Sequence, residues 1–236
     1  MNFPANYIHA IVAIPLFITF SAVSIRSYMK TKNMVTFYLG IAAACYVITL
    51  SFPIILSTNS NVLTIGMMIG ASFELIAGII LWILVARLYA PKADFIRGAI
   101  ISLSIVAAVI AGFLAFRDLM RVPVTMIEDG GVQILYSPVS REYITMLALQ
   151  YVSFFFLSIA FWRQSRTVTT ARDKMRLRIL SVMFAVVFIV LGLLPFSSSG
   201  SDGVLSVAQS LQLAAGLSLL GVFMVITFFI RPDKKA

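Results

Sequence analysis

The sequence predicts an all-α, polytopic membrane protein: one bundle of seven transmembrane helices with an extracellular N-terminus, a cytoplasmic C-terminus and a short extracellular β-hairpin. Three observations support this class. The 236 residues are 61% hydrophobic and 11% charged, whereas soluble domains are about 45–50% apolar and about 25% charged. Seven long apolar runs divide the chain, and basic residues gather in alternate connections. The length suits a single domain covering residues 1–236.

Each apolar run is long enough to cross a bilayer. The hydrocarbon core is about 30 Å thick, which requires about 20 helical residues at roughly 1.5 Å each. Because the backbone finds no water inside the bilayer, helix is the expected conformation. The runs lie at residues 6–25, 34–57, 64–86, 97–116, 142–162, 177–195 and 204–230.

The charge of the connections predicts the orientation. Of the 18 Lys and Arg residues, 15 lie in alternate connections and the C-terminal tail, and only Arg117, Arg121 and Arg141 lie on the opposite side. Basic connections remain in the cytoplasm, so the N-terminus is expected outside. The net charge of +9 then indicates contact with anionic lipids of the inner leaflet, and not with nucleic acid. The 15 residues are Arg26, Lys30, Lys32, Arg87, Lys92, Arg97, Arg163, Arg166, Arg172, Lys174, Arg176, Arg178, Arg231, Lys234 and Lys235.

The connection between the fourth and fifth helices is expected to form the extracellular hairpin, at about residues 119–140. Two β-prone segments, 122–127 and 132–136, flank the sequence Glu128-Asp129-Gly130-Gly131. An Asp-Gly pair between such segments is typical of a hairpin turn. We expect the hairpin to lie over the mouth of the bundle, where it either covers a ligand or shields helix ends without a ligand role.

Glu74, near the middle of the third run, is the one acidic residue inside any of the seven runs, away from their ends. Gly66, Gly70 and Gly78 recur around it at intervals of four residues and therefore share its helix face. Small residues let transmembrane helices approach closely. We therefore expect the glycines to pack against a neighbouring helix and the carboxyl group to point into the bundle, because exposing it to lipid is costly.

The seventh run repeats the pattern of the third. The segment SFELIAG at 72–78 parallels SLQLAAG at 210–216, with Gln212 in the place of Glu74 and Gly216 in the place of a stripe glycine. The first and last three helices also share one orientation, which suggests a duplication in a 3+1+3 arrangement. Chance similarity between two short apolar segments is the alternative.

A shared polar centre is predicted from these residues. Glu74 and Gln212 would face it, together with Gln150 and Gln209. There Glu74 would be either a proton-bound hydrogen-bond donor or the counter-charge for a cation. The alternative is a protonated glutamate that only ties helices together.

Enzymatic and cofactor chemistry is not expected. With one histidine, His9, and one cysteine, Cys45, the chain lacks the ligands for a bis-histidine haem or a zinc site and the pair for an internal disulfide. Every lysine lies in a connection or the tail, which excludes a retinal Schiff base inside the bundle. Motifs of hydrolases, metalloproteases and phosphate-binding loops are missing. We expect no catalytic residue, metal or cofactor.

Two further segments carry predictions. Phe154, Phe155 and Phe156 form a continuous run instead of one helix face, so we expect most of it to meet lipid or a partner. The connection 163–178 is the most basic stretch, and we expect it to contact phospholipids or, alternatively, to dock a cytoplasmic or membrane protein partner. Its four basic residues closest to the sixth helix are Arg172, Lys174, Arg176 and Arg178.

Three features of the layout carry a resemblance: the Asp129-Gly130-Gly131 turn, the arginine-rich connection before the sixth helix, and the Leu193-Leu194-Pro195 end of that helix. Together they resemble the N-terminal seven-helix sensing region of archaeal and bacterial histidine kinases, over most of the chain. The resemblance implies a bundle that senses an outer or membrane-borne signal. The family's cytoplasmic output domain does not follow residues 230–236, so signalling through a separate partner is expected.

Three functions remain open from the sequence. The first is a receptor-like sensor that binds a small ligand below the hairpin and signals through a separate partner. The second is a small-solute or proton-coupled carrier of 3+1+3 topology, with Glu74 as the coupling group; this layout is similar to sugar-type transporters, although their Pro-Gln pair is missing. The third is an accessory subunit of a larger membrane complex. The oligomeric state is not predicted.

Overall fold

A computed structural model describes residues 8–55, 60–122, 124–129, 132–136 and 140–197 of the chain. The predicted seventh helix at 204–230 lies outside these residues, and with it Gln209, Gln212 and Gly216. The expected duplication and the part of the polar centre that depends on helix seven therefore remain predictions.

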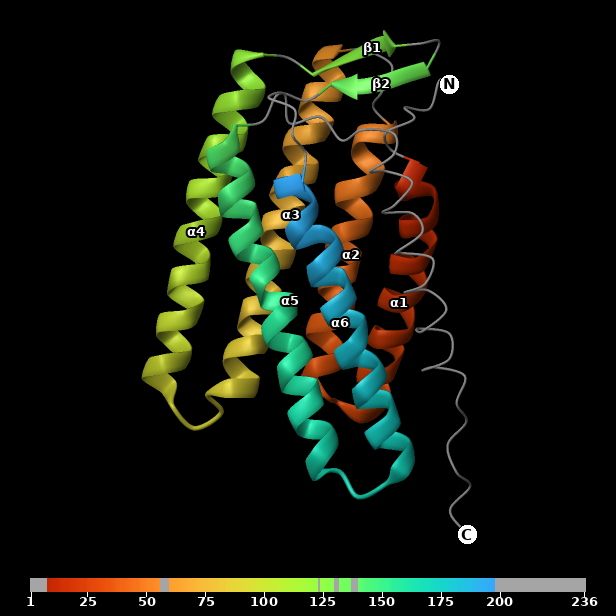
Figure 1. Cartoon of the computed structure of the whole chain (residues 1–236), viewed down its shortest axis with the longest axis vertical. Coiled ribbons are helices and arrows are strands. Elements are labelled where there is room, and N and C mark those ends of the chain that lie inside the picture. The colour runs from red at the N-terminus through yellow and green to blue at the C-terminus, as the bar shows by residue number, and fades with distance from the viewer. Residues whose placement is uncertain (1–7, 56–59, 123, 130–131, 137–139, 198–236) are drawn as a thin grey trace.

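Six helices and two strands make up the described residues, and each helix coincides with one predicted apolar run (Figure 1). The helices are α1 (Ile8–Thr31), α2 (Met34–Ile55), α3 (Ser60–Tyr89), α4 (Asp94–Arg121), α5 (Arg141–Thr167) and α6 (Ala171–Ser197). The strands are β1 (Thr125–Asp129) and β2 (Val132–Tyr136).

Most helices extend beyond their apolar runs, because hydropathy marks only the stretch suited to hydrocarbon. The clearest case is α4, which begins at Asp94 and ends at Arg121, although its apolar run covers only 97–116. An acid in the first turn and a base in the last turn both suit the helix dipole. At the start of α5, the Ser140 hydroxyl accepts a hydrogen bond from the Tyr143 amide and caps the helix.

Five of the described helices are long and apolar enough to span a membrane, so the chain is a helical membrane protein. The spans are Ile8–Thr31, Met34–Phe52, Val62–Tyr89, Asp94–Arg121 and Thr145–Thr167. The sixth predicted run, 177–195, falls on α6, whose side chains are described only as far as Ile189.

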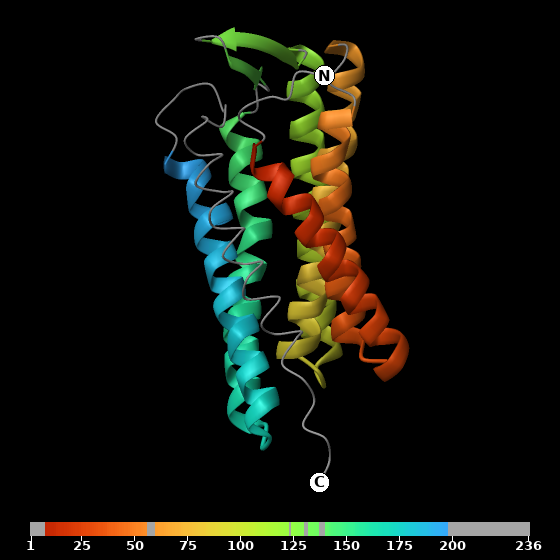
Figure 2. The same ribbon diagram turned by 90° about the vertical axis from the view of Figure 1, so that its right-hand side faces the viewer.

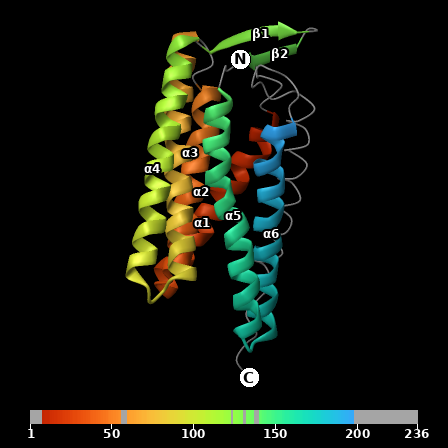
Figure 3. The ribbon, with the colours of Figure 1, turned by 60° about the vertical axis from the view of Figure 1, so that its left-hand side comes forward.

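The helices alternate in direction, so their connections lie at two ends of the bundle. Figure 1 shows the α1–α2, α3–α4 and α5–α6 connections at one end and the two strands at the other. Each helix packs on the next one along the chain, and α5 also packs on α3. Within the described residues α6 packs on α5 alone. Figures 2 and 3 show the result: an α5–α6 pair set beside an α1–α4 group.

The strands form an antiparallel pair in the segment for which the sequence predicts a hairpin. Thr125 lies opposite Tyr136, and Asp129 opposite Val132. The turn residues 130–131 and the side chains of both strands lie outside the described residues. Just before β1, the buried Val124 donates its backbone N–H to the Thr64 hydroxyl of α3 at 3.1 Å, which ties the strand pair to the bundle.

The largest core cluster lies where α1, α2, α3, α5 and α6 converge. Rings dominate it: Phe17 stacks on Tyr46 with centroids 5.4 Å apart, and Phe154 stacks on Phe184 at 5.8 Å. Tyr46 and Phe154 join these two pairs at 6.4 Å. A ladder of ring contacts therefore crosses from α1 to α6 through the middle of the bundle.

Candidate functional site

Glu74 meets its partner in the interior of the bundle. It lies on α3, whose neighbours are α2, α4 and α5. The phenol of Tyr151, on α5, donates a hydrogen bond to Glu74 Oε1. No ion pair in the described part of the chain includes Glu74. The acid is thus held by a neutral donor, and we call this pair the Glu74–Tyr151 centre.

The ring ladder surrounds the centre on the α2 and α5 sides. The Tyr151 ring stacks on Phe154 with centroids 6.1 Å apart, and Phe154 contacts Tyr46 in turn. Tyr46, Tyr151 and Phe154 are all buried. The expectation that most of the phenylalanine run would meet lipid or a partner is wrong for Phe154, which lies in the core. Phe155 is 44% exposed.

The glycines around Glu74 lie at two different helix contacts. A Cβ atom at Gly70 would stand 2.9 Å from the Thr49 carbonyl oxygen of α2. The Thr49 hydroxyl donates to the Gly70 carbonyl at 3.0 Å. A Cβ atom at Gly78 would stand 2.7 Å from Gln150 Oε1 of α5. Gly66 is buried as well. Close approach to α2 and to α5 therefore holds Glu74 between two neighbours.

Gln150 does not join Glu74 directly. Its Nε2 atom donates to the Ser104 carbonyl of α4 at 3.3 Å, and its side chain is 2% exposed. Its Oε1 atom faces α3 at Gly78, one helical turn from Glu74. Of the four predicted members of the polar centre, two are thus placed near each other, and Gln209 and Gln212 lie outside the described residues.

Asp118 is a buried acid within the span Asp94–Arg121, so the expectation that Glu74 is the only acid within a span is wrong. Asp118 lies in the last turn of α4. It accepts hydrogen bonds from Arg117 Nε and Nη2 at 3.0 and 2.8 Å. Its other oxygen accepts the Ser140 backbone N–H at 2.9 Å. The neighbouring arginines had ended the apolar run at residue 116, which concealed that the helix continues.

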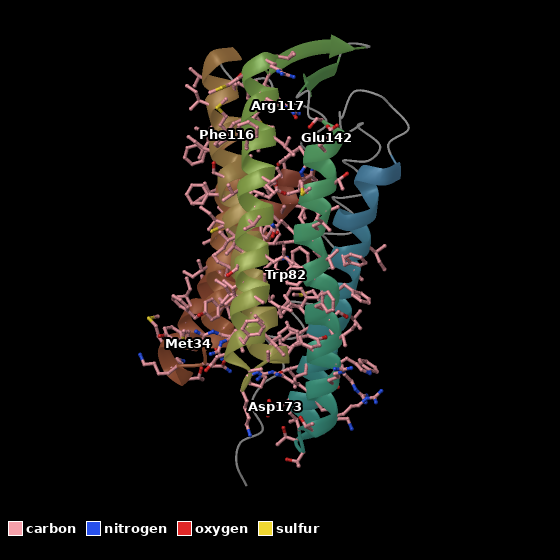
Figure 4. All side chains as sticks on the ribbon, turned by 90° about the vertical axis from the view of Figure 1, so that its left-hand side faces the viewer. Met34, Trp82, Phe116, Arg117, Glu142 and Asp173 are labelled. Atoms are coloured by element: carbon pink, nitrogen blue, oxygen red, sulfur yellow. The ribbon has the colours of Figure 1, made fainter. Side chains whose placement is uncertain are left out.

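The predicted docking residues lie at the opposite end from the strands. Arg178 stands over the Trp162 ring of α5 at 5.4 Å. Arg176 approaches Asp173 at 4.0 Å, and Lys174 is partly buried. The side chain of Arg172 lies outside the described ones. Figure 4 shows Asp173 at this end and Arg117 and Glu142 near the strands.

The outward face of α4 is apolar and exposed over its whole length. Phe95, Leu103 and Phe113 are 88%, 71% and 69% exposed, and Phe116 points away from the bundle in Figure 4. A patch of this size on a soluble monomer would be unusual. Such a face suits the apolar surroundings of a membrane protein.

The sequence matches no protein-family model, and a comparison with curated proteins finds no match.

Proposed function

We propose that the protein is a seven-helix membrane sensor in which the Glu74–Tyr151 centre couples a stimulus to movement of the α5–α6 pair. In this proposal the strand end faces outward and the basic end contacts the inner leaflet of the cell membrane. A separate protein partner receives the signal at the α5–α6 connection. The resemblance to the sensing region of histidine kinases points the same way.

One observation carries the proposal: an interior acid that has a phenol, and no cation, as its described partner. An ionised carboxylate at this depth would be costly, so the acid is stable only with a bound proton or a cationic ligand. Binding of a proton or of a cationic ligand changes the hydrogen bond that Tyr151 donates to Glu74. A reversible change of charge in the core is a common origin of switching.

The position of the centre explains how such a change would reach the surface. Glu74 belongs to the α1–α4 group, and Tyr151 belongs to the α5–α6 pair. Because α6 packs on α5 alone in the described residues, a shift of α5 moves both helices together. The α5–α6 connection is also the most basic stretch, and it would carry the shift to lipid headgroups or to the partner.

Distances between spin labels at the basic end test the coupling. Lys92→Cys in the α3–α4 connection and Thr169→Cys in the α5–α6 connection are both exposed positions. The buried Cys45 is replaced by alanine in all variants. Measured over a range of pH in nanodiscs, Tyr151→Phe should shift the distance distribution because it removes the bond between the two groups. Glu74→Gln should shift it at high pH, where the wild-type carboxyl group loses its proton and the amide cannot.

Glu142→Gln is the matched control, since Glu142 is an exposed acid in the first turn of α5 and should leave the distances unchanged. An unchanged distribution in both Glu74→Gln and Tyr151→Phe would contradict the sensor. Dissipation of an imposed pH gradient in proteoliposomes, lost in Glu74→Gln, would instead assign a proton-coupled carrier. Purification with a constant membrane partner, and instability without it, would assign an accessory subunit.

A further inference from the structure

Two polar atoms of α5 are buried without a hydrogen-bond partner in the described part of the chain. They are Gln150 Oε1 and Ser153 Oγ, on side chains that are 2% and 0% exposed. Buried polar atoms nearly always have a partner, because their loss of hydration otherwise goes uncompensated. Two such atoms on one helix indicate something small and polar between them.

The orientation of the Gln150 amide is fixed by its other contact. Nε2 donates to the Ser104 carbonyl. Turning the amide over would place two acceptor oxygens against each other, so Oε1 must face α3. It does so at Gly78, where a Cβ atom would stand only 2.7 Å away. The missing side chain of Gly78 therefore leaves the carboxamide oxygen next to the α3 backbone.

Gln150 and Ser153 are neighbours on the surface of α5. Residues three apart on a helix are neighbours, with Cβ atoms about 5–6 Å apart. A water molecule can donate to Gln150 Oε1 while accepting from the Ser153 hydroxyl. Buried waters typically make about three hydrogen bonds to groups that would otherwise be unsatisfied. Water fits this pair better than a metal ion, since only two neutral oxygens face it.

We infer that Gln150 and Ser153 hold a buried water where α5 meets α3 and α4. Gln150 Oε1 lies against Gly78 of α3, and Gln150 Nε2 donates to the Ser104 carbonyl of α4. The water therefore belongs to the junction of these three helices, and the site does not depend on the proposed sensor function.

A double-mutant cycle tests the water site. Gln150→Leu, Ser153→Ala and the double variant are compared by thermal unfolding in nanodiscs. A bridging water couples the two residues, so the double variant should lose less stability than the sum of the single losses. If the atoms are bare, Ser153→Ala should instead raise the melting temperature and the effects should add. That outcome would overturn the site. Ser181→Ala, which removes a buried hydroxyl bonded to the Ser158 carbonyl, is the control and should lower the melting temperature.

Discussion

The bundle holds a buried acid, Asp118, and a partly buried one, Glu74, with opposite environments. Asp118 lies at the strand end and binds the Arg117 guanidinium and the Ser140 amide with both of its oxygens. Glu74 lies deep in the bundle with a phenol on Oε1 and no ion pair in the described residues. One acid is charged and satisfied, and it links α4 to the start of α5. The other has no compensating charge among the described residues.

In the proposed sensor, this difference separates a structural group from a switch. A carboxylate with an arginine and a backbone amide loses much when it is protonated, so it has one stable state. A carboxyl group held by a phenol accepts that hydrogen bond with or without its own proton. Its two states are therefore closer in energy, and a stimulus can select between them. The following predictions test this contrast, beginning with the largest expected effect.

Asp118→Ala should cause the largest loss of stability. It leaves the Arg117 guanidinium and the Ser140 N–H without their acceptor. Because hydrogen bonds to charged groups contribute about 1.5–3 kcal/mol each, we expect the free energy of unfolding to fall by about 2–4 kcal/mol. Denaturant titration in mixed micelles measures it. Asp118→Asn, which keeps an acceptor for Ser140, should lose less; equal losses would refute the charged role.

Gly70→Ala should come next. Its new Cβ would stand 2.9 Å from a backbone oxygen of Thr49, and a backbone atom cannot rotate away. The α2–α3 contact beside Glu74 must open, at a cost of about 1–3 kcal/mol. Gly98→Ala, whose Cβ would have nothing within 4 Å, is the control. The melting temperatures of both variants are compared by thermal unfolding. Equal changes would show that α2 is not in close contact with Gly70.

Gly78→Ala sharpens the comparison because its neighbour is a side chain. The Cβ would stand 2.7 Å from Gln150 Oε1, which can move by rotating the amide. We expect a smaller loss than for Gly70→Ala, about 1 kcal/mol, chiefly from the displaced hydrogen bond to Ser104. Unfolding of Gly78→Ala and of Gly78→Ala/Gln150→Ala would check it. If Gly78→Ala lowers the free energy of unfolding by the same amount when Gln150→Ala is also present, the proposed contact is wrong.

Glu74→Gln should change stability least, by less than about 1 kcal/mol, because the amide oxygen still accepts from Tyr151. The same substitution should nevertheless remove the change of the spin-label distances with pH at the basic end, because an amide cannot lose a proton as the carboxyl group does. Tyr151→Phe should lose about 0.5–1.5 kcal/mol by removing the hydrogen bond itself. A loss for Glu74→Gln as large as that for Asp118→Ala would make Glu74 a structural acid too.

The sequence predicted the helices well, but it did not predict which side chains from different helices contact each other. The apolar runs found each of the six described helices, and the spacing of four residues found glycines that lie at helix contacts. Tyr151 was missed as the partner of Glu74, because 77 residues separate them and a tyrosine in an apolar run has no distinguishing pattern. Asp118 was missed because hydropathy ends a span at the first charges, whereas a helix ends where its hydrogen bonds end.

By itself the sequence determined that the chain has helices suited to a bilayer, that an acid lies near the middle of α3, and that basic residues are concentrated in alternate connections. These properties depend on composition and on spacing along one helix, which are local. Only the tertiary structure decided that Gly70 faces α2 while Gly78 faces α5, that Phe154 lies in the core, and that Gln150 turns to α4. Such choices depend on which helix surfaces fit against each other, and that is set by packing between residues far apart in the chain.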